Sequence, residues 1–454
     1  MEQSSFVAVS CFHTNTENGS GQQDRANHSD PDLYVVPVKD ALAHDEQVSL
    51  GICRTESLLT EGQEARGVLE EDQSRSVSSM AQHWAGGHTA PVLCVGAAGG
   101  GDGFLASGAE GGEVTVWTQE GTPLSQLRLT SRDDVTCTVF SNAAPGLLYV
   151  SHGETVSILD PRCLKKPAEE LKDVGEDEIN SLSVSETGAS LALADDSGAV
   201  RVVDLQTCKV SRTLRKHTNI CSSVTFRPQR PQSLVSAGLD MQLMLWNLQK
   251  ARPVWTYSLQ EATEEEERSH QQAGQLFNPP LAHCVSVAAC GNILACAAED
   301  GRVHLTRVGA GSRLEQQGAI KAHSQGASQA HFLNFMPHPY WLATGGNDGV
   351  VALWDISEEP VVAGEVKAKA QRRKPKNKTS KQATHEAQEG KRSEEEITEE
   401  ARSIDPSQTK LASKLKLAHG EKVNWVCPAL LKGQPSLLVA DQSSSLSVYS
   451  LSGL

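Results

Sequence analysis

The sequence predicts an all-β fold, a seven-bladed β-propeller in which four-stranded sheets are arranged around a common axis. The first observation is a recurring unit: an apolar run ends in small residues, a turn follows, and a second apolar run closes the unit. The second is the spacing, because the closing residues of the first four units are 42, 44 and 43 residues apart, the length of one blade. The third is a His that precedes most units at a similar distance.

The clearest units are LATGGNDGVVALWDI at 342–356 and LVSAGLDMQLMLWNL at 234–248. Each has the pattern of a strand, a tight turn and a second strand. The closing residues of the seven units are Trp117, Leu159, Val203, Trp246, Thr306, Trp354 and Tyr449. Two of the steps between them, 60 and 95 residues, are much longer than one blade, and the sequence supplies a polar insertion within each.

These units resemble WD40 repeats, which begin with Gly-His and end with Trp-Asp. The resemblance implies a buried chain of hydrogen bonds in a blade: an Asp in a turn holds the His, and a hydroxyl links the His to the Trp indole. We call these four residues the tetrad. Two units carry it in full: His217, Ser236, Asp240 and Trp246 in one, and His323, Thr344, Asp348 and Trp354 in the other.

The other units depart from the tetrad. The first keeps the His, the Ser and the Trp but has Gly111 where the Asp is expected. In the fifth, His283 and Asp300 fill two of the four positions. The second and third units lack most of the set, so we expect apolar stacking to hold those two blades.

Two segments frame the domain. Residues 80–454 are expected to form the propeller, and residues 1–79, which are polar and lack periodicity, a disordered N-terminal extension. The last unit, 419–451, supplies only three strands. A strand around Trp84 would complete it, which would close the ring and remove its exposed sheet edges.

The two insertions differ in charge pattern. The first, 260–280, is expected to be an acidic loop. The second, 357–410, separates eight basic residues at 367–381 from seven acids at 386–400 and is expected to be a disordered charged linker. Its basic cluster is a candidate nuclear-import signal made of Arg372, Arg373, Lys374, Lys376 and Lys378.

Composition and motifs narrow the function classes. The eleven cysteines contain no C-x-x-C pair, so we expect free thiols and neither a metal nor a cofactor. No apolar window is long enough to cross a membrane, and the N-terminus lacks the basic start of a signal peptide. We therefore expect an intracellular protein, in the nucleus, the cytoplasm or both.

Catalysis and nucleic-acid binding are not expected. The sequence has no phosphate-binding loop, nucleophile elbow or metal-ligand helix, which argues against an enzyme. The formal net charge of −15 argues against a nucleic-acid partner. A rigid, monomeric ring with two loop-lined ends and no chemistry is a docking platform for other proteins.

The resemblance also implies one specific partner. WD40 proteins that serve as substrate receptors of cullin-4 ubiquitin ligases often carry Trp-Asp-x-Arg at the end of a blade, and the Arg contacts the adaptor of the ligase. Leu159, Asp160 and Arg162 match this motif, with Leu in place of Trp. The alternative is a scaffold independent of ubiquitin, or a reader of a peptide such as a histone tail in a nuclear complex.

Overall fold

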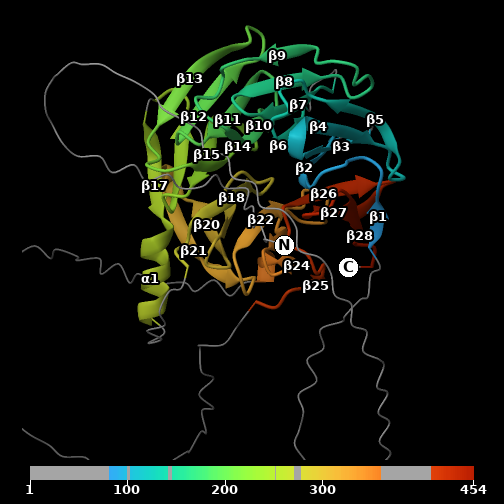
Figure 1. Cartoon of the computed structure of the whole chain (residues 1–454). Coiled ribbons are helices and arrows are strands. Elements are labelled where there is room, and N and C mark those ends of the chain that lie inside the picture. Colours follow the sequence, from blue (N-terminus) through green and yellow to red (C-terminus); the bar gives the residue numbers. More distant parts are fainter. Residues whose placement is uncertain are drawn as a thin grey trace, which may run out of the picture. The chain divides into compact units, whose positions relative to one another are not determined.

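The computed structural model describes residues 81–99, 103–141, 146–250, 252–269, 278–358 and 411–453. These residues form seven four-stranded antiparallel sheets arranged as a β-propeller, so the predicted seven blades are confirmed (Figure 1). In six of the sheets the strands run outward from the centre in chain order, and in the seventh the outer strand is the first strand of the chain. The predicted extension 1–79, residue 80 and most of the charged linker lie outside the described residues.

The first four blades are continuous in sequence. Blade 1 contains β2 (Val92–Ala97), β3 (Leu105–Ala109), β4 (Glu113–Trp117) and β5 (Pro123–Arg128). Blade 2 contains β6 (Val135–Phe140), β7 (Leu148–His152), β8 (Thr155–Leu159) and β9 (Glu169–Leu171). Blade 3 contains β10 (Ile179–Val184), β11 (Ser190–Asp195), β12 (Ala199–Asp204) and β13 (Lys209–Arg215). Blade 4 contains β14 (Cys221–Arg227), β15 (Arg230–Gly238), β16 (Gln242–Asn247) and β17 (Pro253–Ser258).

The last three blades take up the insertions and the chain closure. Blade 5 contains β18 (Ala282–Val287), β19 (Ile293–Ala298), β20 (Arg302–Val308) and β21 (Leu314–Lys321). Blade 6 contains β22 (Ala327–Phe332), β23 (Trp341–Gly346), β24 (Val350–Asp355) and β25 (Leu415–Ala418). Blade 7 contains β26 (Trp425–Leu431), β27 (Gln434–Ala440), β28 (Leu446–Ser450) and, as its outer strand, β1 (Gln82–Trp84).

The ring closes as the sequence predicts. Strand β1 pairs antiparallel with β28, with Trp84 opposite Leu446, and Figure 1 shows these two strands side by side. Trp84 is buried, and its ring centroid lies 5.9 Å from that of Trp117 in blade 1. The closing strand therefore completes blade 7 and also packs against its neighbour.

Neighbouring blades are joined by apolar clusters and by polar side chains near the start of the innermost strands. In five blades such a side chain donates a hydrogen bond to a backbone carbonyl of the next blade. These pairs are Thr136 to Ile179, Asn180 to Cys221, Ser222 to Ala282, Ser328 to Val423, and Asn424 to Val92. The last of them joins blade 7 to blade 1, so the polar connections continue across the closure.

Trp425 occupies the centre of the ring. It belongs to blade 7, yet its side chain packs against the apolar cores that blades 1, 2 and 3 share. Its ring centroid also lies 5.9 Å from that of His331 in blade 6. One side chain that reaches so many blades must lie in the central channel and narrow it.

The predicted acidic loop at 260–280 is wrong over its first half, because α1 (Leu259–Ser269) is a helix. Ser258 Oγ accepts a hydrogen bond from the backbone N–H of Glu261, which caps the first turn. Leu259, Ala262 and Thr263 are buried, so one face of the helix packs on the propeller. The acids that suggested a solvated loop are also good helix formers. It is the sole α-helix of the described residues, and it is too short and too polar to cross a bilayer.

The two ends of the ring carry different connections. The turns that join the first strand to the second, and the third strand to the fourth, lie at one end of the ring, which we call the lower end. The upper end carries the turns between the second and third strands and the links between blades. Helix α1 follows β17 at the upper end, and β24 ends and β25 begins at the lower end of blade 6.

Candidate functional sites: the polar centres of the blades and the lower-end arginine

Blade 4 brings its four tetrad residues together. The Trp246 indole N–H donates to Ser236 Oγ at 2.8 Å, and Ser236 Oγ lies 2.8 Å from Nε2 of His217. Nδ1 of His217 lies 2.9 Å from Asp240 Oδ1. Because the carboxylate can only accept, the proton sits on Nδ1 and the Ser hydroxyl donates to Nε2. The backbone N–H of Thr218 also donates to Asp240, at 3.0 Å, so the carboxylate ties the turn to the His loop.

Blade 6 repeats this arrangement with Thr344 as the hydroxyl. Its Oγ1 lies 3.0 Å from both the indole nitrogen of Trp354 and Nε2 of His323. Nδ1 of His323 lies 2.9 Å from Asp348. Burial lowers the pKa of His323, and the backbone N–H of Ser324 and the imidazole together hold the pKa of Asp348 below its usual value against the effect of burial. The imidazole is therefore neutral and the carboxylate ionised at neutral pH.

In blade 1 a glutamate supplies the carboxylate that the sequence lacks at Gly111. His88 Nε2 lies 2.5 Å from Ser107 Oγ, which also accepts from the Trp117 indole at 2.7 Å. Glu113, the first residue of β4, accepts from the backbone N–H of Thr89 at 2.7 Å, but its carboxylate stays 3.6 Å from His88 Nδ1. Burial lowers the pKa of His88 to about 4, and the Glu113 carboxylate, which acts in the opposite direction, does not offset it.

Blade 7 forms a three-residue version. Nε2 of His419 lies 2.9 Å from Asp441, and Nδ1 lies 2.8 Å from the hydroxyl of Tyr449. Tyr449 stands at the closing position where the tetrad has Trp. Its own hydroxyl reaches the imidazole, so no Ser or Thr is needed between them.

Blade 5 does not use His283 as the sequence analysis expected. His283 is the second residue of the innermost strand β18, and its Nε2 lies 2.8 Å from Glu299. Asp300 instead lies 3.5 Å from His304 on β20, and both side chains are almost fully buried. In blades 4 and 6 the His of the tetrad lies in the link between blades, four residues before the innermost strand (β14 or β22). In blade 5 the residue four positions before the innermost strand β18 is Asn278.

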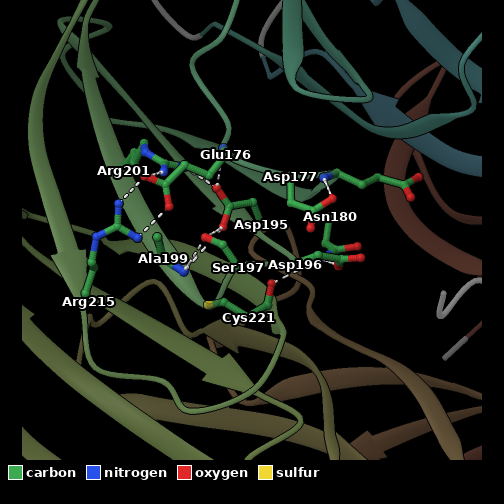
Figure 2. Close-up of polar contacts among 11 residues, drawn as sticks. Glu176, Asp177, Asn180, Asp195, Asp196, Ser197, Ala199, Arg201, Arg215 and Cys221 are labelled. Atoms are coloured by element: carbon green, nitrogen blue, oxygen red, sulfur yellow. Dashed lines mark hydrogen bonds and ion pairs between the residues drawn. The ribbon is translucent and has the colours of Figure 1, made fainter. Parts of the chain in front are cut away.

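Blade 3 replaces the tetrad with charges (Figure 2). Arg201 on β12 forms an ion pair with Asp195 on β11, and both are almost fully buried. Its second terminal nitrogen lies 2.8 Å from Glu176, which also binds Arg215 through both carboxylate oxygens. The hydrogen bonds from Arg215 lower the pKa of Glu176 to about 2.

Blade 2 holds a smaller polar cluster. Nε2 of His152 lies 2.8 Å from Ser157 Oγ, and Nδ1 lies 3.0 Å from Ser131 Oγ. His152 and Ser157 are buried. Apolar clusters join blades 2 and 3 to their neighbours as expected, and both blades also contain hydrogen-bonded polar groups that the tetrad pattern does not detect.

The substitute polar groups share one position in the third strand. Arg201 of blade 3 corresponds in position to Met244 of blade 4. Met244 lies opposite Ser236 on the second strand, and Arg201 lies opposite Leu193 at the same place in the register. His304 of blade 5 and Ser157 of blade 2 occupy this position in their own blades. A polar residue two positions before the closing residue is thus the sequence signal for a blade without a tetrad.

Arg162 lies at the lower end of blade 2. Leu159, at the closing position, is fully buried at the end of β8, and the turn that follows exposes Arg162, whose side chain is 53% accessible. Asp160 Oδ1 accepts from the Arg162 backbone N–H at 3.0 Å and from Nε at 2.9 Å. The carboxylate therefore sets the direction of the guanidinium. The basic cluster at 372–378 lies outside the described residues.

Comparison with known proteins gives the family. The family described as "WD domain, G-beta repeat" matches residues 208–247 and 314–355, which contain the two complete tetrads. The chain therefore contains WD40 repeats in these two segments. WD40 propellers typically bind other proteins, which makes this chain a protein-interaction scaffold.

Three curated WD40 relatives illustrate the range of similarity. WD repeat-containing protein 53 homolog of Dictyostelium discoideum is 23% identical over 226 residues, 47% of this chain and 61% of that protein. THO complex subunit 6 of Homo sapiens is 28% identical over 188 residues, 38% of this chain and 54% of that protein. Echinoderm microtubule-associated protein-like 2 of Rattus norvegicus is 24% identical over 275 residues, 59% of this chain and 36% of that protein. The matches thus span about three fifths or less of the length of these relatives.

Proposed function

We propose that the lower end around Arg162 binds the adaptor of a cullin-4 ubiquitin ligase, which would make this WD40 protein a substrate receptor. The observation that carries the proposal is the exposed Arg162 two residues after Asp160 at the end of β8, as in the Trp-Asp-x-Arg motif. Leu159 replaces the Trp of the motif, but it is buried and anchors the turn as a closing residue would.

The local geometry suits a partner contact. Pro161 follows the strand and cannot continue its hydrogen bonding, so the chain turns, and the backbone N–H of Cys163 donates to the Asp160 carbonyl at 2.9 Å. The Asp160 carboxylate holds the guanidinium by Nε. A guanidinium oriented in this way can bind a carboxylate or carbonyl groups of a partner in a forked geometry that Lys cannot reproduce.

Co-purification of the tagged full-length chain from cells tests this proposal. We expect the adaptor among the co-purified proteins, and we expect Arg162→Ala to deplete it strongly and Arg162→Lys to deplete it less. Arg132→Ala is the matched control, since Arg132 is an exposed arginine at the upper end. Absence of the adaptor from the wild-type sample would reject the receptor role.

A second candidate is a ubiquitin-independent scaffold or peptide reader in a nuclear complex. Five carboxylates gather at the upper end of blades 2 and 3: Asp133, Asp134, Asp177, Glu178 and Asp196. Burial and the other four carboxylates raise the pKa of Glu178. Such a surface favours a basic peptide such as a histone tail. The similarity to THO complex subunit 6, by name a subunit of a larger complex, also supports this candidate. Co-purification of chromatin subunits without the adaptor would favour it.

Two further parts of the proposal concern catalysis and assembly. We propose that the chain is not an enzyme, since Ser236 Oγ and His217 are buried and hydrogen-bonded to each other and cannot meet a substrate. We also propose that the ring acts as a monomer, because β1 completes blade 7 within the same chain. Sedimentation equilibrium at micromolar concentration would contradict this if the mass exceeded that of one chain.

The last part of the proposal concerns where in the cell the protein is found. We propose that Arg372, Arg373, Lys374, Lys376 and Lys378 act as a nuclear-import signal. Replacing all five by Ala should move a fluorescently tagged chain from the nucleus to the cytoplasm without changing its solubility. An unchanged distribution would reject the signal.

A further inference from the structure

The lower and upper ends of blades 2 to 4 carry opposite charge. Seven exposed basic residues lie at the lower end, in or beside the turns of three consecutive blades, and we call them the basic rim: Arg162, Lys165, Lys166, Lys209, Arg230, Lys250 and Arg252. The upper end of blades 2 and 3 carries the five carboxylates named above. The ring is therefore electrically polarised along its axis on this side.

Several acids at the lower end are engaged within the protein, by their own turn or by the turn of the next blade. Asp204 accepts the backbone N–H groups of Gln206 and Thr207, at 3.0 and 2.8 Å. Glu186 accepts the backbone N–H of Gln229 at 3.0 Å, and Asp160 holds Arg162. The pKa of Asp204 is lowered by the Thr207 hydrogen bonds and that of Asp160 by Arg162, so both stay ionised as internal acceptors. These carboxylates accept hydrogen bonds from the protein, whereas the seven basic residues are exposed.

The three turns form one surface. Arg212 Nε donates to the Leu248 carbonyl at 3.3 Å, which joins the outer strand of blade 3 to the turn that carries Lys250 and Arg252. The contact between Glu186 and Gln229 joins the lower turns of blades 3 and 4. Cys208 packs against the apolar cluster that blades 2 and 3 share, which joins blade 2 to the turn before Lys209. The basic residues are therefore held in a fixed arrangement.

We propose that the basic rim is a docking surface for an acidic face of a protein partner. In the receptor role, on which this inference rests, the cullin-4 adaptor would contact blades 2 to 4 and not Arg162 alone. Charge complementarity carries the choice of partner. A nucleic-acid partner fits less well, because the chain has a formal net charge of −15, whereas polyanion-binding proteins carry a strongly basic balance.

The first experiment measures binding of purified adaptor to the full chain and to two triple variants. Lys209→Glu, Lys250→Glu and Arg252→Glu together reverse the rim without touching Arg162. Arg132→Glu, Lys172→Glu and Lys216→Glu make the same change in charge at exposed sites of the upper end. We expect the rim variant to bind at least about tenfold more weakly at low salt, with the difference shrinking as salt screens the charges. The upper-end variant should bind like wild type.

A second probe separates this inference from the receptor role. A 20-residue polyglutamate peptide should bind wild type and the upper-end variant at low salt, and should not bind the rim variant. If the adaptor fails to bind wild type, the receptor role falls, and the peptide alone decides on the rim. Equal adaptor binding by wild type and the rim variant overturns the inference, as does a 20-nucleotide single-stranded RNA that binds the rim where polyglutamate does not. All variants should melt within a few degrees of wild type, since the changed side chains are exposed.

Discussion

Blades 3 and 4 are neighbours with the same strands and register but different polar centres. In blade 4, Gly238 ends the second strand next to the imidazole, and a Cβ there would lie 2.8 Å from His217 Nδ1. In blade 3 the equivalent residue is Asp195, which pairs with Ile179 as Gly238 pairs with Cys221. The Asp195 side chain takes the space of the missing His, and Arg201 stands where blade 4 has Met244 on the third strand.

The difference shows that two neighbouring blades of the same geometry can be built around different sets of polar residues. A neutral chain of hydrogen bonds and an ion pair both leave few buried groups unpaired. Neither centre is open to a ligand, because Ser236, Trp246 and Asp195 have no exposed surface. Function is therefore expected at the ends of the ring, and the polar centres are expected to act on stability.

The largest effect should come from breaking the blade 3 ion pair. Arg201→Met leaves Asp195 buried without its cation, and we expect a loss of about 3–5 kcal/mol in the free energy of unfolding. Combining it with Asp195→Gly installs the blade 4 residues at both positions and should restore at least about half of that loss. Urea denaturation of the two variants measures this. A double variant as unstable as the single one would show that the two centres are not interchangeable.

His88 should make blade 1 sensitive to acid. Its pKa is about 4 when folded and about 6.5 when unfolded, so the unfolded state binds the proton more readily and stability falls as pH drops from about 6.5 to 4. At pH 5 the penalty is about 2 kcal/mol, from about 1.4 kcal/mol for each pH unit. His88→Gln should lose correspondingly less stability between pH 7 and pH 5. The same pH dependence in both proteins would contradict the buried neutral imidazole.

Removing the carboxylate of a tetrad should have a moderate effect. Asp348→Ala leaves the His323 N–H without its acceptor and should reduce stability by about 1–3 kcal/mol. Asp348→Asn keeps an oxygen at the same place and should cost less. Thermal melting can rank the three proteins, and an Asp348→Ala variant as stable as wild type would mean that the blade 6 tetrad does not stabilise the fold.

The smallest effect on stability should come from Arg162→Ala. Its ion pair with Asp160 is about half exposed, so we expect a change of less than about 1 kcal/mol. A larger loss would mean that Arg162 holds the turn together, and its role in binding would then be difficult to separate from its role in folding. Thermal melting of this variant therefore precedes any binding study.

The sequence predicted the ring, its seven blades and the closing strand because the apolar pattern and the period repeat along the chain. It did not predict the Arg201–Asp195 ion pair of blade 3, because the tetrad pattern requires a His that this blade lacks. The signal was present in AVRVVD at 199–204, where an Arg stands among apolar residues two positions before the closing Val203. Glu113 was missed for a different reason. It stands two positions after Gly111, where the tetrad pattern expects no acid, and its longer side chain still reaches the backbone N–H of Thr89.

Other features depend on contacts distant in sequence. Trp425 begins a strand, as Trp341 does, and only the closed ring brings it against blades 1 to 3. The helix α1 was missed because its run of glutamates dominates the composition, although Ser258 stands where an N-cap residue is expected. The basic rim is scattered over residues 162–252 and becomes one surface only when the turns of three blades meet at the lower end.

The affinity of the purified cullin-4 adaptor for this WD40 chain, measured by isothermal titration calorimetry, tests the central claim most directly. An arginine at the centre of an interface commonly contributes about 2 kcal/mol, so Arg162→Ala should weaken binding roughly thirtyfold and Arg162→Lys by less. Arg132→Ala should bind like wild type. Equal affinities for wild type and Arg162→Ala would contradict the claim that this arginine anchors the partner at the lower end of the ring.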